Sequence, residues 1–188
     1  EFANKFDVPV RVLSSFKDGN GTLISIGEEN MENALVSGIA FQKDQVKFTL
    51  HGVGDTPGTA FKILGPISDA DIEVDVIVQN VSVDGKTDFT FTVSSDDQSS
   101  VQNIIEEIKE DVNFRELIID SNIAKVSIVG AGMRSQAGVA STAFKSLSEH
   151  DVNIQIICTS EIKITMVIDK SLVEKAVQVL HNEFNLDK

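Results

Sequence analysis

The sequence predicts an α+β protein built from two related units, the first of them inserted into the second. Three observations lead to this prediction. The chain has 188 residues, 41% hydrophobic and 24% charged, a globular composition with room for one or two compact cores. One pattern occurs twice about 80 residues apart, and each copy alternates strand-like and helix-like segments in the same order.

The repeat is clearest around two glycine-containing loops. The run 46–54 is echoed by the run 126–132, with Gly52 matching Gly130 at a spacing of 78 residues. Two further stretches recur at a spacing of 80 residues, 58–60 as 138–140 and 71–77 as 151–157. A match that keeps its order over this length indicates a duplicated domain rather than a solenoid repeat.

The first copy begins with a strand at Gln45–Val53. In the loop that follows, Asp55 is expected to cap a helix and Pro57 to lie in its first turn. An apolar stripe predicts the helix, although Gly65 and Pro66 should shorten or kink it. The stripe consists of Ala60, Ile63, Leu64 and Ile67.

The rest of the first copy predicts two strands, a helix and a closing strand. The strands Glu73–Gln79 and Asp88–Val93 flank a turn at 83–86 and form a hairpin. A second helical stripe follows, and Arg115–Asp120 closes the copy. The order βαββαβ is usually solved by the ferredoxin-like fold, one antiparallel sheet with both helices on one face. The second stripe consists of Val101, Ile104, Ile105, Ile108 and Val112.

The second copy lacks the last strand of this order. It predicts strands at 124–129, 153–158 and 161–168, and helices at 138–150 and along a stripe that starts at Val173. The open sheet edge needs a partner, and the unassigned strand-like run Val36–Phe41 fits that place. We therefore expect two ferredoxin-like βαββαβ units, the first inserted between this early strand and the rest of the second.

These elements set the expected boundaries. Residues 44–120 form the first unit, and residues 34–41 plus 121–188 form the second. Residues 1–30 belong to neither copy and predict a hairpin of two strands around a turn at 18–21.

Composition and charge exclude several function classes. The formal net charge of −13 and the pI near 4.5 repel phosphate backbones and anionic lipid headgroups, so neither nucleic acid nor a membrane is expected as a partner. The single Cys158 lies in an apolar run and is expected to be a buried thiol. With no membrane span or signal peptide in the sequence, a cytoplasmic location is expected. His51, His150 and His181 show no metal-ligand spacing, so no metal is expected.

No catalytic or nucleotide-binding motif is complete. Gly130 and Gly132 lie in a strand-to-helix loop, but Ser135 replaces the third glycine of a dinucleotide-binding fingerprint. The loop 52–58 lacks the Gly-Lys-Ser/Thr ending of a phosphate loop. Because no nucleophile, base and orienting group share a local signature, no catalytic residue is assigned.

The glycine-containing loop before the first helix does recur. Backbone N–H groups at a helix start can bind a carboxylate, and Gly58 or Gly138 would allow its close approach. Asp55 can accept an ammonium group, and the second strand of each copy ends in polar residues at the same edge, Gln79-Asn80 and 159–161. Together these groups describe a pocket for a free amino acid.

Two stretches, Val46–Asn80 and Lys125–Glu161, resemble tandem ACT domains, which are small amino-acid-binding regulatory modules. More narrowly, the runs 79–81, 125–133 and 153–162 are similar to the regulatory region of bacterial aspartate kinase. The runs 8–16 and 21–24 resemble the end of the catalytic domain of that family and the start of its linker. Since the lysine-and-glycine motif for ATP and aspartate is absent, the resemblance implies a regulatory, beta-subunit-like fragment that is inactive alone.

The resemblance also implies where effectors bind. Threonine, lysine or both would lie between an ACT unit of one chain and the other unit of a partner chain, with Glu161 as the counter-charge for a lysine side chain. Glu73 and Ala140 depart from the family pattern, which commonly has asparagine and threonine there. The implied effector-binding residues are Asp55, Gly58, Ala60, Ile72, Asp75 and Gln79, faced by Asn153 and Ile154, and in the second pocket Met133, Ser135, Gly138, Val139, Ala140, Asn153, Ser160 and Glu161.

The function implied by the resemblance is feedback inhibition of aspartate phosphorylation in the biosynthesis of lysine, threonine and methionine. It implies a homodimer joined through ACT domains and an attached catalytic domain that binds ATP and Mg²⁺, with no cofactor in this chain. The alternatives are a ligand-free dimerisation module, an amino-acid sensor of another ACT-containing enzyme, and an RNA-binding domain, which the acidic charge opposes. A ligand-free module would have well-packed loops around Gly58 and Gly138 and no pocket. Apart from these function classes, Asp75 and Gln155 can be simple solvated strand positions.

Overall fold

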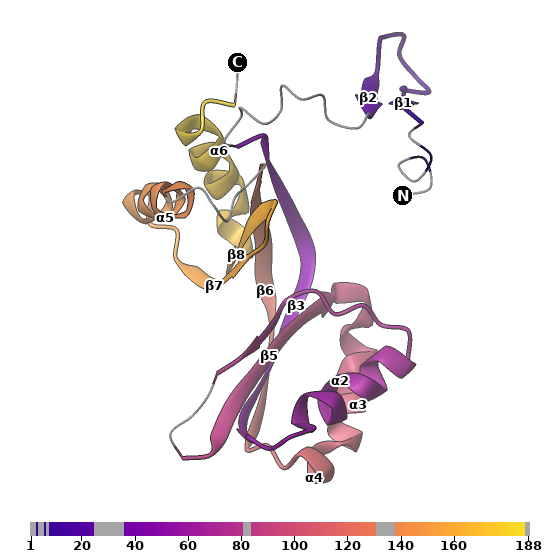
Figure 1. The fold of residues 1–188 in the computed structure, drawn as a ribbon, viewed down its shortest axis with the longest axis vertical. Helices are drawn as coiled ribbons and strands as arrows, with labels where there is room; N and C mark the ends of the chain where they lie inside the picture. Colours follow the sequence, from indigo (N-terminus) through magenta and orange to yellow (C-terminus); the bar gives the residue numbers. More distant parts are fainter. Residues whose placement is uncertain are drawn as a thin grey trace.

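The computed structural model describes residues 3, 6, 8–24, 36–80, 84–130 and 138–186. A six-stranded antiparallel sheet in the order β4-β5-β3-β6-β8-β7 forms the centre of the structure (Figure 1). Its strands are β3 (Gly38–Gly54), β4 (Ile77–Gln79), β5 (Lys86–Ser94), β6 (Glu116–Val129), β7 (Ile154–Thr159) and β8 (Lys163–Asp169). The helices are α2 (Thr59–Asp69), α3 (Gln98–Glu107), α4 (Lys109–Val112), α5 (Val139–Glu149) and α6 (Val173–Glu183), with short 3₁₀ helices η2 (Ser95–Asp97) and η3 (Lys170–Leu172).

The two longest strands, β3 and β6, run through both units. The first half of β3 pairs with the second half of β6, so that Gly38 faces Val129, and the second half of β3 pairs with β5 and with the start of β6. The early strand therefore closes the sheet of the second unit, which confirms the predicted insertion. The sequence predicted four separate strands here, and this was wrong, because β-bulges around Gln42–Lys47 keep the ladder continuous.

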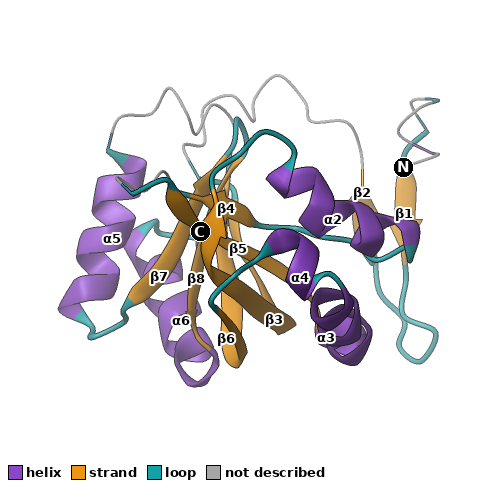
Figure 2. Cartoon of the chain, turned by 90° about the horizontal axis from the view of Figure 1, so that it is seen from below, coloured by secondary structure: helices purple, strands orange, loops and turns teal. Residues whose placement is uncertain are grey.

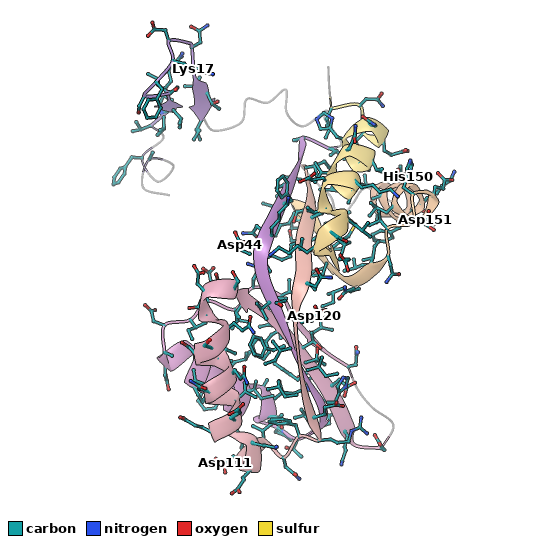
Figure 3. The ribbon with its side chains drawn as sticks, turned by 180° about the vertical axis from the view of Figure 1, so that it is seen from behind. Lys17, Asp44, Asp111, Asp120, His150 and Asp151 are labelled. Carbon is teal, nitrogen blue, oxygen red and sulfur yellow. The ribbon has the colours of Figure 1, made fainter. Side chains whose placement is uncertain are left out.

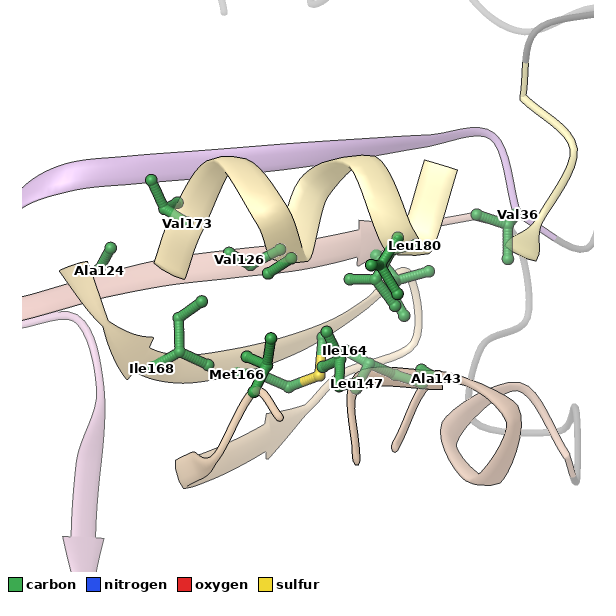
Figure 4. Packing of buried hydrophobic residues seen from close by; sticks show 14 of the residues in the cluster. Val36, Ala124, Val126, Ala143, Leu147, Ile164, Met166, Ile168, Val173 and Leu180 are labelled. Carbon is green, nitrogen blue, oxygen red and sulfur yellow. The ribbon is translucent and has the colours of Figure 1, made fainter. Parts of the chain in front are cut away.

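Each unit has its own core, covered by its own helices. In the first unit, α2 and α3 pack on β3 and β5, and Phe48 and Phe91 stack at its centre with ring centroids 5.4 Å apart. In the second unit, α5 and α6 cover β6 and β8 around Leu147, Met166 and Leu180 (Figure 4). Viewed from below, the α5–α6 pair and the α2–α3 pair lie on opposite sides of the strands (Figure 2).

The duplication extends to details of the backbone. Gly58 and Gly138 precede α2 and α5 with φ of 94° and 131°, and each helix has eleven residues. Asp71 and Asp151 follow those helices, both in the left-handed region with φ of 57°. Because a non-glycine residue rarely adopts this conformation, its recurrence at a spacing of 80 residues supports a common origin of the two units.

The start of α2 differs from the prediction. Gly58, not Asp55, is the N-cap residue, and no side-chain oxygen of the described residues caps the helix. Asp55 instead donates its backbone N–H to the carbonyl of Gly85 over 2.9 Å. Pro66 lies inside α2 without shortening it, since α2 is as long as α5.

Three further predictions were wrong in detail. The strand predicted at 73–79 is reduced to β4. The hydroxyl of Thr92 accepts a hydrogen bond from the N–H of Val76, and this interrupts the regular strand pairing. The second helical stripe is divided into α3 and α4 at Ile108, whose ψ of 3° is not helical. Cys158 is exposed rather than buried, because β7 is an edge strand of the sheet.

The N-terminal hairpin consists of β1 (Val10–Val12) and β2 (Thr22–Ile24), which pair antiparallel and are exposed along their whole length. It forms a sheet of its own. Among the described residues, none of the helices has the length and apolar character needed to cross a bilayer.

Candidate functional site

The strand register divides the predicted effector-binding residues into two groups. One group lies at the outer ends of the units, where β3 ends at Gly54 and β6 ends at Val129. The other lies at the junction, where β3 and β6 pass from one unit to the other and Gln45 faces Ile123. Met133 and Ser135 fall outside the described residues. The outer group consists of Asp55, Gly58, Ala60, Gln79, Gly138, Val139, Ala140, Ser160 and Glu161, and the junction group of Ile72, Asp75, Asn153 and Ile154.

The outer turn of the first unit is held by its own backbone and by threonine hydroxyls. Thr59 donates its hydroxyl to the Gly54 carbonyl over 2.9 Å and lies 3.1 Å from the hydroxyl of Thr56. A Cβ built on Gly58 meets nothing within 4 Å. The inner side of the turn is therefore held by hydrogen bonds, and Gly58 is exposed on its outer side.

At the outer end of the second unit, the structure describes Gly138 and the residues that follow it. A Cβ built on Gly138 also meets nothing within 4 Å among the described residues, and Val139 behind it is buried. Ser160 shapes the neighbouring β7–β8 turn, because its hydroxyl accepts the N–H of Lys163 over 3.2 Å. Glu161 is exposed beside it.

At the junction, two lysines form reciprocal contacts between the units. Lys47 and Lys125 occupy equivalent positions, 78 residues apart, in the first strand of each unit. Lys125 pairs with the carboxylate of Asp75 in the first unit, and Lys47 donates to the amide oxygen of Gln155 in the second. Since Asp75 and Gln155 are themselves equivalent, the two contacts are related by an approximate two-fold symmetry. Both acceptors are exposed, and each is held by a lysine of the other unit.

The electrostatics of the two lysines differ. Lys47 also lies 3.1 Å from Asp120. The side chain of Lys125 is only 3% exposed, and this burial is the main reason that its pKa lies below the ordinary value. The charge of Lys163 lowers this pKa further, whereas the charge of Glu73 acts in the opposite direction.

Beside Lys125 lies a cleft of about 630 Å³, which we call the acidic junction cleft. Its lining includes four carboxylates and two lysines. Of its lining residues, Asp75 alone is among the effector-binding residues implied by the sequence. The four consecutive polar residues at 42–45 interrupt the strand alternation and signal an irregular segment. The lining residues are Phe41, Gln42, Lys43, Asp44, Gln45, Glu73, Asp75, Val93, Ser94, Asp97 and Lys125.

A smaller cleft of about 220 Å³ lies near the outer end of the first unit, between Asn80, Asp88 and Arg115. Asp88 accepts the N–H of Gly52 over 3.0 Å and lies 2.9 Å from Nδ1 of His51. The Gly52 hydrogen bond is the main cause that lowers the pKa of Asp88, and it outweighs the effect of burial. His51 and Arg115 lower this pKa further.

We expect Asp88→Asn to lower the free energy of unfolding by less than about 1 kcal/mol at pH 7, because the Asp88 side chain is 47% exposed. A depressed carboxyl pKa stabilises the fold above the unfolded value, near 3.9, and this stabilisation is lost as the pH falls through the folded value. The difference between the two proteins should therefore shrink below about pH 4. Urea unfolding from pH 7 to pH 3 measures it, and a difference independent of pH would contradict the assignment.

In the part of the chain that the structure describes, no group of three or more His, Cys, Asp or Glu side chains could hold a metal ion. Other described features suit charged small molecules, namely the exposed Gly58 turn and the two polar clefts.

Two family models match the chain, and both are described as ACT domain. One covers residues 50–113 and the other residues 126–184, so that one match falls on each repeated unit. An aspartate kinase from Pseudomonas fluorescens is 56% identical over 188 residues, which are 100% of this chain and 46% of that protein. The chain thus spans about half the length of the curated relatives it matches.

Solved structures agree with these matches. Aspartokinase alpha and beta subunits are 46% identical, with a TM-score of 0.76, over 80% of this chain and 99% of that chain. The ligand-free regulatory subunit of aspartate kinase from Thermus thermophilus is 32% identical over the same shares, also with a TM-score of 0.76. E. coli aspartokinase III in complex with lysine and aspartate is 25% identical over 99% of this chain and 40% of that chain, with a TM-score of 0.72.

Two ACT domains in tandem and a 46% identity that extends over almost all of a solved aspartokinase subunit lead to one conclusion. The chain belongs to the aspartate kinase family and corresponds to its regulatory ACT region.

Proposed function

We propose that this chain senses lysine or threonine for an aspartate kinase, and that effector binding at ACT interfaces inhibits aspartate phosphorylation. The phosphorylation itself, with ATP and Mg²⁺, would take place in a catalytic domain to which this region belongs. The feedback signal would then be an end product of the same biosynthetic route.

The pair of equivalent turns at Gly58 and Gly138 carries the proposal. Both glycines have a positive φ and both precede an eleven-residue helix, and no described residue lies within 4 Å of a Cβ built on either one. Backbone N–H groups at a helix start suit the carboxylate of an amino acid. Two such sites would bind two effector molecules per chain.

Lysine is the first effector to test. The solved structure of E. coli aspartokinase III is a complex with lysine and aspartate. Its fold matches 99% of this chain, which corresponds to 40% of the E. coli chain. Exposed Glu161, next to the β7–β8 turn, would provide a carboxylate for the lysine side chain. Threonine would need a hydroxyl partner instead, for which Gln79 is the candidate.

The sheet edges favour pairing with a second copy. β4 and β7 are the two edge strands, and each presents an exposed isoleucine, Ile77 at 49% and Ile157 at 48% exposure. Unpaired strand edges with apolar side chains are usually covered in a stable protein. A homodimer would cover them and would bring the turn of one unit against a partner unit.

If dimerisation occurs without any ligand, the same edges support the second candidate, a ligand-free dimerisation module.

Inhibition requires that the effector bind one arrangement of the units more tightly than another. Ile72 and Asp75 follow α2, the helix that starts at the Gly58 turn, and Asp75 pairs with Lys125 of the other unit. A ligand that shifts α2 would therefore act on the junction. A coupling free energy of about 1–3 kcal/mol is normal for such a mechanism.

We expect Gln79→Ala to weaken threonine binding by about 1–3 kcal/mol if the amide pairs with the ligand hydroxyl in a buried site. Isothermal titration calorimetry of the chain measures the change. Gln178→Ala, on the exposed face of α6, is the matched control and should leave the affinity unchanged.

The choice of ligands tests the proposal itself. Norleucine keeps the head group and alkyl chain of lysine but lacks its terminal ammonium, so it should bind more weakly than lysine. Sedimentation with and without ligand reports the dimer. Absence of heat and of thermal stabilisation with both lysine and threonine would remove the sensor proposal, and a dimer under those conditions would favour the ligand-free module.

A further inference from the structure

The acidic junction cleft lies away from the glycine turns and carries an excess of negative charge. Four carboxylates line it against two ammonium groups, and both lysines are already engaged. Lys43 pairs with Glu174 over 3.0 Å and lies 5.7 Å above the ring of Phe41, and Lys125 pairs with Asp75.

Three of the four carboxylates form no close ion pair among the described residues, although the charge of Glu73 acts on Lys125. Within the described ranges, no nitrogen of a basic side chain lies within 4 Å of the carboxylates of Asp44, Glu73 or Asp97. Like charges that share a cleft repel one another, and a bound cation relieves that repulsion. The cleft as a whole has two more negative than positive groups.

An unpartnered polar atom gives independent evidence for a ligand. Gln45 is 91% buried, since only 9% of its surface is exposed, and it lines the cleft. Its Nε2 donates to the Asp44 carbonyl over 2.9 Å, but its Oε1 is buried and has no hydrogen-bond partner. Buried acceptors are satisfied in most native proteins, so this oxygen indicates a missing donor.

The shape and composition of the cleft favour an organic cation over a metal ion. The carboxylates come from three separate segments, the β3 bulge, the residues before β4, and η2, and no three described acids are placed to hold a metal. The half-exposed side chain of Phe41 supplies apolar surface in the cleft. A volume of about 630 Å³ is in the range of small-molecule sites.

We propose that the acidic junction cleft binds a linear organic diammonium ion, with one ammonium near Glu73 and Gln45 and the other near Asp97 and Asp44. The methylene chain lies along Phe41. Two positive charges match the excess of two negative charges. A free amino acid does not suit this cleft, because the four carboxylates repel its α-carboxylate. Figure 3 shows Asp44 on β3 close to the level of Asp120, where the two units meet.

The test is calorimetric titration of the chain with 1,5-diaminopentane at low salt, together with thermal unfolding in its presence. We expect binding and an increase in the unfolding temperature. Pentylamine, which has one ammonium, should bind at least about tenfold more weakly, since one charge-assisted contact is lost. Lysine should not compete with the diamine.

Matched variants localise the site. Glu73→Gln and Asp97→Asn should each weaken diamine binding about tenfold. Asp111→Asn makes the same change of charge on α4, at the far end of the first unit from Asp44 (Figure 3), and should leave affinity within about twofold. These variants should leave lysine and threonine binding unchanged, which separates this inference from the proposed function.

Gln45→Met distinguishes a ligand contact from a structural role. Methionine has a similar shape but removes the unpartnered oxygen, so the unfolding temperature of the free chain should not fall, while diamine affinity should fall about tenfold. Equal weakening by Asp111→Asn, equal stabilisation by Mg²⁺, or no diamine binding at low salt would each overturn the proposal.

Discussion

Phe91→Ala is expected to lower the free energy of unfolding by about 3–5 kcal/mol, the range found when a fully buried phenylalanine is truncated. Phe91 is 0% exposed, stacks on Phe48 with an interplanar angle of 8°, and contacts Phe89 at a ring distance of 6.3 Å. Its removal leaves a cavity between β5 and the helices, and the aromatic contacts are lost with it. Urea unfolding followed by circular dichroism measures the change.

The control for this prediction is Phe16→Ala in the loop between β1 and β2. Phe16 is 96% exposed, so its truncation should change the free energy of unfolding by less than about 0.5 kcal/mol. Because each unit has its own core, the Phe91 variant should affect the first unit most. Equal protection of amide hydrogens in both units would show instead that the shared strands β3 and β6 make the unfolding fully cooperative.

The second large effect is expected at the junction, where Asp75→Ala should cost about 2–3 kcal/mol. The variant leaves the ammonium of Lys125, 3% exposed, with only the charge of Glu73 beside it. A buried charge that loses its partner typically costs 3–5 kcal/mol, and the lower figure here reflects the 42% exposure of the Asp75 side chain. The loss should shrink toward alkaline pH, because the depressed pKa of Lys125 lets its amine become neutral there.

Lys125→Met supplies the matched comparison. It removes the charge and keeps most of the side-chain volume, so it should change stability by less than about 1.5 kcal/mol. The double variant with Asp75→Ala should be no less stable than Lys125→Met alone. If Lys125→Met proves as harmful as Asp75→Ala, then packing rather than charge compensation explains the junction.

Much of the fold could be predicted because the duplicated units repeat their periodicities. The strand-like alternation around Phe48 and the helical stripe that includes Ile63 are local patterns, and local patterns are readable in sequence. The place of the early strand followed from an open edge in the second unit. The continuity of β3 was not predictable, because the polar run 42–45 looks like a turn, and only pairing with β6 on one side and β5 on the other keeps it extended.

The candidate site could be predicted only in part. The positive-φ glycines before α2 and α5 follow from the residues, and among the described residues nothing lies within 4 Å of a Cβ built on either one. The lysine partners of Asp75 and Gln155 could not be predicted from the sequence, because a lysine in a strand is usually expected in solvent. Cys158 was misjudged for a related reason, since an apolar run does not reveal whether its strand lies in the middle or at the edge of a sheet.

The sequence by itself determined the duplicated topology, the insertion of one unit into the other, the acidic charge and the position of the two glycine turns. Only the tertiary structure decided which groups meet at the junction. Lys125 and Asp75 are 50 residues apart, and Lys47 and Gln155 are 108 apart. Contacts of that kind depend on the relative position of two folded units, which arises from bulges and twist in shared strands rather than from the periodicity of any one segment.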